Sequence, residues 1–421
     1  MYEMGEQLER VILAGVQTYE SDDTVQSLYE LRELAETAGA VTVGTIMQSR
    51  ETIHPATYLG KGKLEELKEL LYDLDATGVI CDDELSPAQL NNLEQELECK
   101  VMDRTMVILD IFAQRAKTSE GKIQVELAQL KYRAVRLVGL RASLSRLGGG
   151  IGTRGPGEKK LETDRRHIKE RISELESDLK DIETHRGLLR SGRSKKGVVN
   201  VSLVGYTNAG KSTLLNKMTD AGVLAEDKLF ATLDTTSRNL KLPSGTSIML
   251  TDTVGFIRKL PHHLIKAFRA TLEEMKYADI LIHVVDASNP DRMGQMNAVY
   301  ETLKELGCEK TPVITAFNKM DRNVELPLPY DTIARQTVKI SAKSGDGTAE
   351  LAEAVETLIK SFKKPIKAVI PYSEGKLTAL VYSRCEIINS EHRDDGICVE
   401  LYADEEMENR LEQYTVLKEI K

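Results

Sequence analysis

The run Gly205–Ser212, GYTNAGKS, has the residue types and spacing of a loop that binds phosphate groups. It follows an apolar run, Val198–Val204, and a helical pattern over Ser212–Met218 comes next, so a strand, a glycine-rich loop and a helix are expected in succession. Glycines let the backbone wrap a phosphate closely, the amides point inward, and the helix N-terminus adds positive potential. Lys211 would bring a point charge to the β- and γ-phosphates, and Ser212 would offer a hydroxyl to Mg²⁺.

Three further motifs each follow an apolar run that is expected to form a strand. In Asp252-Thr253-Val254-Gly255 the Asp can hold Mg²⁺ through water, and the Gly lets its amide approach the γ-phosphate. In Asn318-Lys319-Met320-Asp321 the carboxylate of Asp321 can accept two hydrogen bonds from guanine, a donor pair that adenine lacks. In Ser341-Ala342-Lys343 the amide of Ala342 can donate to guanine O6. Four motifs in this order, each at the end of a strand, predict a GTP-binding domain built on a parallel sheet.

Between the phosphate loop and Asp252, a loop hydroxyl would cap the γ-phosphate and complete the Mg²⁺ shell. The segment Leu229–Thr236, LFATLDTT, lies in this interval, and the residues alone do not choose among four candidates. These candidates are Thr232, Thr235, Thr236 and Ser237.

The residues that would carry hydrolysis are Lys211 and Asn208. Many signalling GTPases have a Gln after the DxxG glycine to orient water, but this chain has Phe256 there, so slow intrinsic hydrolysis and stimulation by a partner are expected. In some related GTPases an Asn at this position of the phosphate loop binds K⁺, and that resemblance implies that K⁺ at Asn208 would offset charge in the transition state. The alternative for Asn208 is a local turn bond, since Asn is a common turn former.

The composition fits a globular protein of two to four domains, since the chain has 421 residues of which 41% are apolar. No window of 18 uncharged apolar residues suggests a membrane span, and the N-terminus lacks the features of a secretion signal. The five cysteines are scattered without a CxxC pair, so neither disulfides nor structural zinc are indicated. The cytosol is the expected location, and a monomer is expected.

Charge is distributed unevenly along the chain. The net charge is −9, yet residues 131–200 hold 18 Lys and Arg against 9 Asp and Glu. A basic segment in an acidic protein localises a surface that attracts phosphates. The break Gly148–Lys160, GGGIGTRGPGEKK, lies inside this segment between two helical patterns with narrow apolar stripes.

The two helical patterns predict an antiparallel hairpin with the glycine-rich break at its tip. Each arm would reach roughly 35–40 Å. Arg154, Lys159 and Lys160 would meet RNA phosphates there, and glycines would let the backbone approach. A passive loop is the alternative, but a helix–helix turn needs only about 2–8 residues.

The fold class is therefore predicted as α/β, with four parts. They are a small α/β domain with a mainly parallel sheet over 1–110, the helical hairpin with its tip and linker over 111–197, the GTPase domain over 198–363 and a small α+β appendage over 364–421. The stretch Gly60-Lys61-Gly62-Lys63 resembles a phosphate loop only faintly and is interpreted as the start of a helix.

The chain resembles the HflX family of GTPases over roughly residues 10–365. The GTPase motifs give only the class, and specificity comes from the glycine-rich run joined to LETDRR, after KIQVELAQLKYR (Lys122–Arg133). The stretches Thr57–Leu67 and Asp82–Glu94 fit as well. The resemblance implies a cytoplasmic GTPase that binds the large (50S) ribosomal subunit and its rRNA and, as in well-studied members, splits or rescues stalled ribosomes.

Carried over by position, the resemblance implies Ser212 and Thr232 as Mg²⁺ ligands. It implies GTP contacts from Gly205, Tyr206, Thr207, Asn208, Ala209, Gly210, Lys211, Ser212, Phe230, Ala231, Thr232, Leu233, Asp234, Asp252, Thr253, Val254, Gly255, Asn318, Lys319, Met320, Asp321, Ser341, Ala342 and Lys343. A second hypothesis is a regulatory GTPase that switches a protein partner through its N-terminal region, with the basic hairpin merely a dimerising coiled coil. The +9 segment favours the ribosomal hypothesis.

Overall fold

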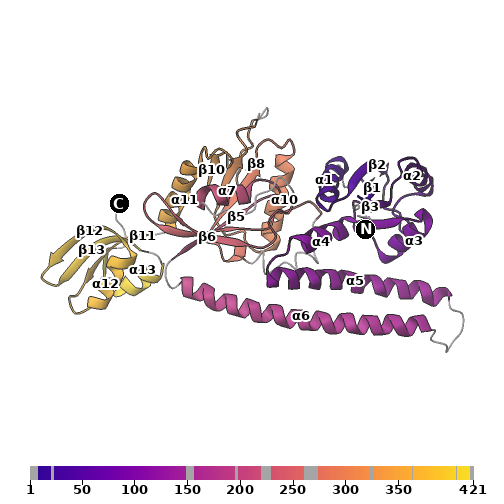
Figure 1. Cartoon of the computed structure of the whole chain (residues 1–421). Helices are drawn as coiled ribbons and strands as arrows, with labels where there is room; N and C mark the ends of the chain where they lie inside the picture. Colours follow the sequence, from indigo (N-terminus) through magenta and orange to yellow (C-terminus); the bar gives the residue numbers. More distant parts are fainter. Residues whose placement is uncertain are drawn as a thin grey trace, which may run out of the picture.

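The computed structural model describes residues 8–19, 23–147, 156–194, 198–219, 229–259, 274–322, 327–362, 364–403 and 405–417. Three separate sheets organise the chain: one near the N-terminus, one in the middle and one near the C-terminus, with two long helices running beneath the first two in the view of Figure 1. Within these ranges no helix is long and apolar enough to cross a membrane.

The N-terminal sheet has the strand order β2-β1-β3-β4, and all of its pairings are parallel, which confirms the predicted small α/β domain. The inner strand β1 (Arg10–Gln17) is buried over six consecutive residues, as expected when helices cover both faces of a parallel sheet. Its strands are β1 (Arg10–Gln17), β2 (Val41–Ser49), β3 (Gly78–Cys81) and β4 (Lys100–Asp103). Its helices are α1 (Thr24–Thr37), α2 (Lys61–Asp73), α3 (Pro87–Leu97) and α4 (Arg104–Arg115).

Two helix starts in this domain follow directly from the sequence. Ser86 caps α3 with a reciprocal capping box to Gln89, and Pro87 stands in the first turn. Gly60 is the cap residue of α2, so the glycine–lysine stretch is the start of a helix.

The helical hairpin consists of α5 (Ser119–Leu147) and α6 (Pro156–Ser194). At 1.5 Å per residue, 29 and 39 residues give about 44 and 58 Å, longer than predicted because each helix continues beyond its apolar stripe. Ion pairs join Glu120 to Arg186 and Lys131 to Glu176. The paired position falls along α6 as it rises along α5, so the two helices run antiparallel as predicted. The break 148–155, with Arg154, lies outside the described residues, and Lys159 and Lys160 fall in the first turns of α6.

The N-terminal half of α5 packs on the first domain instead of projecting freely. Val125, Leu127 and Ala128 are buried. The Tyr132 hydroxyl donates to Asp103 at 2.5 Å, and Arg136 donates to the same carboxylate at 2.7 Å. The hairpin is therefore fixed to the N-terminal domain through its base.

The middle sheet has the order β10-β9-β8-β5-β7-β6, and its first four pairings are parallel, which confirms the predicted GTPase fold. The edge strand β6 pairs antiparallel with β7 and is not predicted from the sequence, because TSRNLK has little apolar signal. The strands are β5 (Val199–Val204), β6 (Thr236–Lys241), β7 (Ser247–Asp252), β8 (Ile280–Asp286), β9 (Val313–Asn318) and β10 (Gln336–Lys339). The helices are α7 (Lys211–Thr219), α10 (Arg292–Glu305) and α11 (Thr348–Phe362).

The C-terminal sheet is antiparallel in the order β12-β13-β11-β14 and buries one apolar cluster of its own. This α+β appendage was predicted, but α13 and β14 were not, because both are short and α13 is mostly polar. Its elements are β11 (Lys364–Ile370), α12 (Gly375–Arg384), β12 (Glu386–Arg393), β13 (Gly396–Ala403), α13 (Glu405–Leu411), η1 (Glu412–Tyr414) and β14 (Thr415–Leu417).

Candidate nucleotide-binding site

The loop between β5 and α7 closes around the side chain of Lys211. Its ammonium donates to the carbonyls of Gly205 at 3.1 Å and Tyr206 at 2.8 Å, so it lies across the loop. Burial lowers the pKa of Lys211 to about 8, and the nearby carboxylate of Asp252 offsets part of this effect. A polyphosphate would supply the negative charge that this buried cation lacks.

Two glycines allow the close approaches that the site needs. Gly210 has a φ of +96°, and a Cβ there would lie 2.3 Å from the side-chain nitrogen of Asn318. A Cβ on Gly255 would lie 2.7 Å from the Cα of Thr207 and 3.0 Å from the ammonium of Lys211. The phosphate loop and the DTVG loop therefore touch at positions where only glycine fits.

Three oxygen-bearing side chains converge beside the lysine. The Ser212 hydroxyl donates to Asp252 at 2.6 Å and lies 2.7 Å from the hydroxyl of Thr232. The second carboxylate oxygen of Asp252, Oδ1, is buried and has no hydrogen-bond partner among the described residues. Burial raises the pKa of Asp252, although Lys211 opposes this. Hard oxygen ligands around an unpaired buried carboxylate oxygen fit Mg²⁺.

The position of Thr232 separates it from the other hydroxyl candidates of this segment. Thr232 lines the pocket, whereas Thr236 begins the edge strand β6. Within that strand the Ser237 hydroxyl shares a hydrogen bond of 2.8 Å with Thr251 on β7. Thr236 and Ser237 therefore belong to the edge strand β6, and neither of them lines the pocket.

The pocket has a volume of about 410 Å³ and is open to solvent. It is lined by Thr207, Asn208, Gly210, Lys211, Ser212, Thr213, Phe230, Ala231, Thr232, Thr253 and Gly255. All of these except Thr213 are among the expected GTP contacts.

Next to the phosphate pocket, Asn318 ties three loops together. Its side-chain oxygen accepts from the amide of Ala342 at 2.8 Å, and its nitrogen donates to the carbonyl of Ala209 at 2.8 Å. Lys319 forms an ion pair with Asp286 at 2.7 Å. The NKMD and SAK motifs therefore meet the phosphate loop at one edge of the sheet.

Asp321 lies at the surface of this corner. The Ser341 hydroxyl donates to it at 2.7 Å and is the main reason that its pKa lies below the usual value. The carboxylate is therefore held as an anion that is accessible to a base with N–H donors. Lys343 is exposed next to it.

Several expected GTP contacts have side chains that are engaged elsewhere than in the pocket. Thr253 lines the pocket but commits its hydroxyl to the carbonyl of Leu203 at 2.6 Å. Val254 and Leu233 are buried in the apolar core that the middle sheet shares with the N-terminal domain. Met320 packs into a smaller apolar cluster. The carboxylate of Asp234 is engaged by the segment before α5.

Phe256 is buried and points into the same shared core. Its amide donates to Gly205 at 3.1 Å, and its carbonyl accepts from Thr207 at 2.8 Å. The residue after the DTVG motif thus joins that loop to the phosphate loop through its backbone, and its ring offers no group to orient water.

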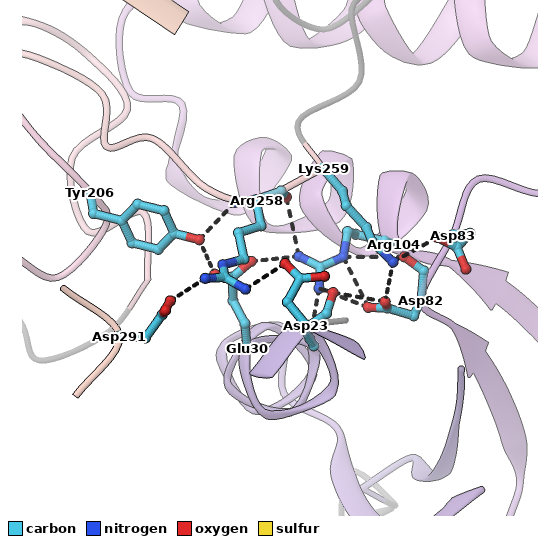
Figure 2. A network of polar contacts seen from close by, with 10 residues as sticks. Asp23, Glu30, Asp82, Asp83, Arg104, Tyr206, Arg258, Lys259 and Asp291 are labelled. Carbon is cyan, nitrogen blue, oxygen red and sulfur yellow. Dashed lines mark hydrogen bonds and ion pairs between the residues drawn. The ribbon is translucent and has the colours of Figure 1, made fainter. Parts of the chain in front are cut away.

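A buried polar network joins the phosphate loop and the segment after DTVG to the N-terminal domain (Figure 2). Arg104, at the start of α4, is 1% exposed and bonds Asp82 at 2.8 Å and Glu30 at 2.6 Å. Lys259 bonds the same Asp82 at 2.6 Å. Burial opposes the ionisation of Asp82, but Arg104 and Lys259 outweigh it and hold its pKa below the usual value.

Tyr206 and Arg258 extend this network into the GTPase domain. The Tyr206 hydroxyl accepts from the amide of Arg258 at 2.7 Å and donates to Glu30. The Arg258 guanidinium pairs with Asp23 of the N-terminal domain at 2.6 Å and also with Asp291. Sequence reasoning missed these residues. The sequence signal for them is weak: Arg104 follows the short strand β4, whose last residue is itself charged.

A phosphate loop with a buried lysine, a serine–threonine–aspartate oxygen cluster and a joined NKMD–SAK corner on a parallel sheet defines a P-loop GTPase. Family models match along the chain: "GTP-binding GTPase N-terminal" over residues 25–113, "GTP-binding GTPase Middle Region" over 115–193 and "50S ribosome-binding GTPase" over 200–319. The GTPase HflX of Lacrimispora saccharolytica is 58% identical over 97% of this chain and 96% of that protein.

The GTPase HflX of Escherichia coli K12 is 42% identical over 94% of this chain and 92% of its own length. A solved GTP-binding protein from the archaeon Sulfolobus solfataricus, in complex with GDP, is 24% identical over 84% of this chain and 99% of that one, with a TM-score of 0.43. The chain belongs to the HflX family of GTPases.

Proposed function

We propose that this GTPase associates with the large ribosomal subunit, contacts rRNA through the basic tip of its helical hairpin, and splits or rescues stalled ribosomes. The observation that carries the proposal is that the N-terminal domain contacts both the basic helical hairpin and the loops of the nucleotide pocket. The first half of α5 is packed on the N-terminal domain, and that domain contacts the loops of the pocket. The name of the matching family model, which refers to the 50S subunit, supports the same partner.

The roles at the pocket follow from its contacts. Lys211 would neutralise the β- and γ-phosphates, and the glycine-rich loop would surround them with amides. Ser212 and Thr232 would hold Mg²⁺ directly, with Asp252 acting through water, and the ion would neutralise charge that develops on the phosphates. Asp321 would accept from guanine, while Asn318 holds the loops of the base site in place.

Hydrolysis would depend on the ribosome, because the chain places no polar side chain at Phe256 to orient water. Asn208 lines the pocket and has a φ of +58°, a conformation that Asn tolerates better than most residues. K⁺ bound beside Asn208 would offset the negative charge that develops on the phosphates in the transition state.

The test is sedimentation of the full chain with purified large subunits at two salt concentrations, with a non-hydrolysable GTP analogue or with GDP. We expect binding with the analogue that weakens at high salt, because phosphate contacts release counterions. Replacing Arg154, Lys159 and Lys160 by Gln should weaken this binding and reduce its salt dependence, while the affinity for GTP in free solution stays unchanged.

The matched control removes three exposed lysines elsewhere, Lys304, Lys310 and Lys360, which changes net charge by the same amount. If the control loses as much binding as the tip variant, the tip is not the contact. If the wild type does not bind the subunit with either nucleotide, the ribosomal proposal fails. The polar network between the N-terminal domain and the segment after DTVG would then favour a switch that acts on a protein partner.

A further inference from the structure

The segment Leu229–Asp234 contacts both the nucleotide pocket and the apolar core. Ala231 and Thr232 line the nucleotide pocket. Leu233 is buried in the core shared with α4 and α5. Phe230 borders the pocket as well, but it is buried in the same core, and its ring meets that of Phe112 edge-on with a centroid distance of 4.8 Å. The position of Thr232 is therefore set from the side of the N-terminal domain.

The last residue of the segment, Asp234, binds the start of the hairpin. Its carboxylate accepts from the backbone amides of Lys117 at 2.9 Å and Thr118 at 3.0 Å. It also accepts from the Thr118 hydroxyl at 2.5 Å. That hydroxyl in turn accepts from the amide of Gly121 at 2.9 Å, so it uses its proton toward Asp234 and a lone pair toward the helix.

Thr118 is thus the N-terminal cap of α5, and Asp234 holds the capping residue in place by accepting its amide and hydroxyl hydrogen bonds. A carboxylate near the first turn of a helix is stabilised by the unpaired amides there and by the helix dipole. Because α5 is 29 residues long and forms one arm of the hairpin, Asp234 connects the pocket segment to the base of that arm.

Gly121 provides independent support for this connection. Gly121 is buried in the first turn of α5, and a Cβ there would lie 2.3 Å from the Asp234 carboxylate and 3.1 Å from the Thr118 hydroxyl. Glycine is a poor helix former, so its position in this turn needs a reason, and the approach of Asp234 supplies one.

We propose that Asp234 is a positioning residue that holds Thr232 in the arrangement that binds Mg²⁺ and the γ-phosphate. Thr118 binds the Asp234 carboxylate, and Gly121 leaves room for it. The proposal rests on the assignment of Thr232 to Mg²⁺ under the proposed function. Asp234 then touches neither nucleotide nor metal. Through Asp234, the conformation of the segment Leu229–Asp234 depends on the contacts at the start of α5. Because such coupling is reciprocal, nucleotide bound to this segment also affects the start of α5.

The experiment measures the affinities of the full chain for a non-hydrolysable GTP analogue and for GDP, over a range of Mg²⁺ concentrations. Gly121→Ala would displace the Asp234 carboxylate from the amides at the start of α5 without changing the net charge. Asp234→Asn would remove the negative charge of this side chain. We expect both variants to bind the analogue roughly 5- to 20-fold more weakly, to need more Mg²⁺ for it, and to bind GDP within about twofold of the wild type.

Gly187→Ala is the matched control, because Gly187 lies in α6 and a Cβ there meets no atom within 4 Å. Thr118→Ser keeps the hydroxyl and should bind like the wild type, whereas Thr118→Val should lose part of the preference for the analogue. Hydrogen exchange at the amides of Lys117 and Thr118 gives a readout without hydrolysis. These amides should be more protected with the analogue than with GDP in the wild type, and this difference should vanish in Asp234→Asn.

The outcomes separate this inference from the proposed function. A wild type that prefers the analogue, together with Gly121→Ala and Asp234→Asn variants that keep the same analogue-to-GDP ratio, would overturn the role of Asp234 alone. Equal losses for both nucleotides would also overturn it, since they would indicate a general structural role. A wild type that fails to bind the analogue would overturn the proposed function itself.

Discussion

The buried guanidinium of Arg104 should be strongly coupled to the carboxylate of Asp82. The side chain of Arg104 is 1% exposed and that of Asp82 is 0% exposed, and their atoms lie 2.8 Å apart. Arg104 also donates to the carbonyl of Ser27 at 2.7 Å. Replacing Arg104 by Met would leave Asp82 with Lys259 and Ser27 as partners, so the unfolding free energy should fall by about 3–4 kcal/mol, as for other broken buried ion pairs.

The double variant Asp82→Asn/Arg104→Met removes both charges. In the double variant Asp82 no longer carries a charge that needs Arg104, and the loss of the Glu30 contact occurs in both Arg104 variants and cancels in the cycle. Its loss of stability should therefore be about 2 kcal/mol smaller than the sum of the two single losses. The assay is urea unfolding followed by circular dichroism, with the four proteins compared at pH 7. Additive losses, with a coupling below about 0.5 kcal/mol, would refute the assignment of a coupled pair.

A pH series checks the sign of this effect. The folded-state pKa of Asp82 lies below its usual value, so its contribution to stability is present at neutral pH and is lost as the pH falls through that lowered pKa. In Arg104→Met, burial without the guanidinium should raise the pKa of Asp82, so the group takes up a proton at a higher pH than in the wild type. The stability gap between the two proteins should therefore shrink as the pH falls toward about 3.9. A gap that stays constant would contradict this explanation.

Three further predictions concern the nucleotide site. Lys211→Ala should bind GTP and GDP roughly 10- to 100-fold more weakly by calorimetry, because a charge-assisted contact to phosphate is lost; unchanged affinity would remove Lys211 from the site. Asp321→Asn should weaken GTP by at least about 100-fold and favour xanthosine triphosphate, because one of the two acceptor oxygens for guanine is replaced by an NH2 donor; an unchanged order of affinities would contradict the guanine assignment. If Asn208 helps to hold K⁺, GTP turnover should be faster in KCl than in NaCl, and equal rates would eliminate that role.

The parts of this site that could be predicted from sequence are those defined within one strand and the loop after it. The phosphate loop, DTVG, NKMD and SAK each follow an apolar run, and a parallel sheet brings the carboxyl ends of such runs to one edge. Local chemistry also accounts for the start of α3, where Ser86 and Gln89 form a capping box.

The parts that could not be predicted depend on contacts between distant segments. The β6 strand reads TSRNLK, which has little apolar signal, and it forms because β7 offers a free edge. The choice of Thr232 over Thr236 depends on where that strand begins. Asp234 looks like one more polar loop residue until the chain folds and places the residues before α5 beside it. Nothing near it in sequence indicates the partner, which lies 116 residues away.

The N-terminal sheet illustrates how the same principles lead to a different use. The chain passes from β1 to β2 on one side of β1 and then crosses to β3 on its other side, so the strand order reverses between β1 and β3. The crevice at the carboxyl ends of strands at such a point is where sheets of this kind usually bind ligands. Asp82 and Asp83 directly follow β3 at this point. Here the ammonium of Lys259 bonds Asp82 at 2.6 Å and Asp83 at 2.7 Å. Lys259 has a φ of +51°, a strained conformation for a lysine that these contacts help to hold.

The ligand of this crevice is therefore a side chain from the segment that follows the DTVG motif of the same chain. The two carboxylates at this crevice are thus matched to a cation of the same chain. Any change at the nucleotide that moves the segment after DTVG must either carry the N-terminal domain with it or break the contacts of Lys259 with two carboxylates. Because α5 is packed on that same domain, the base of the hairpin would be displaced in the first case and left in place in the second.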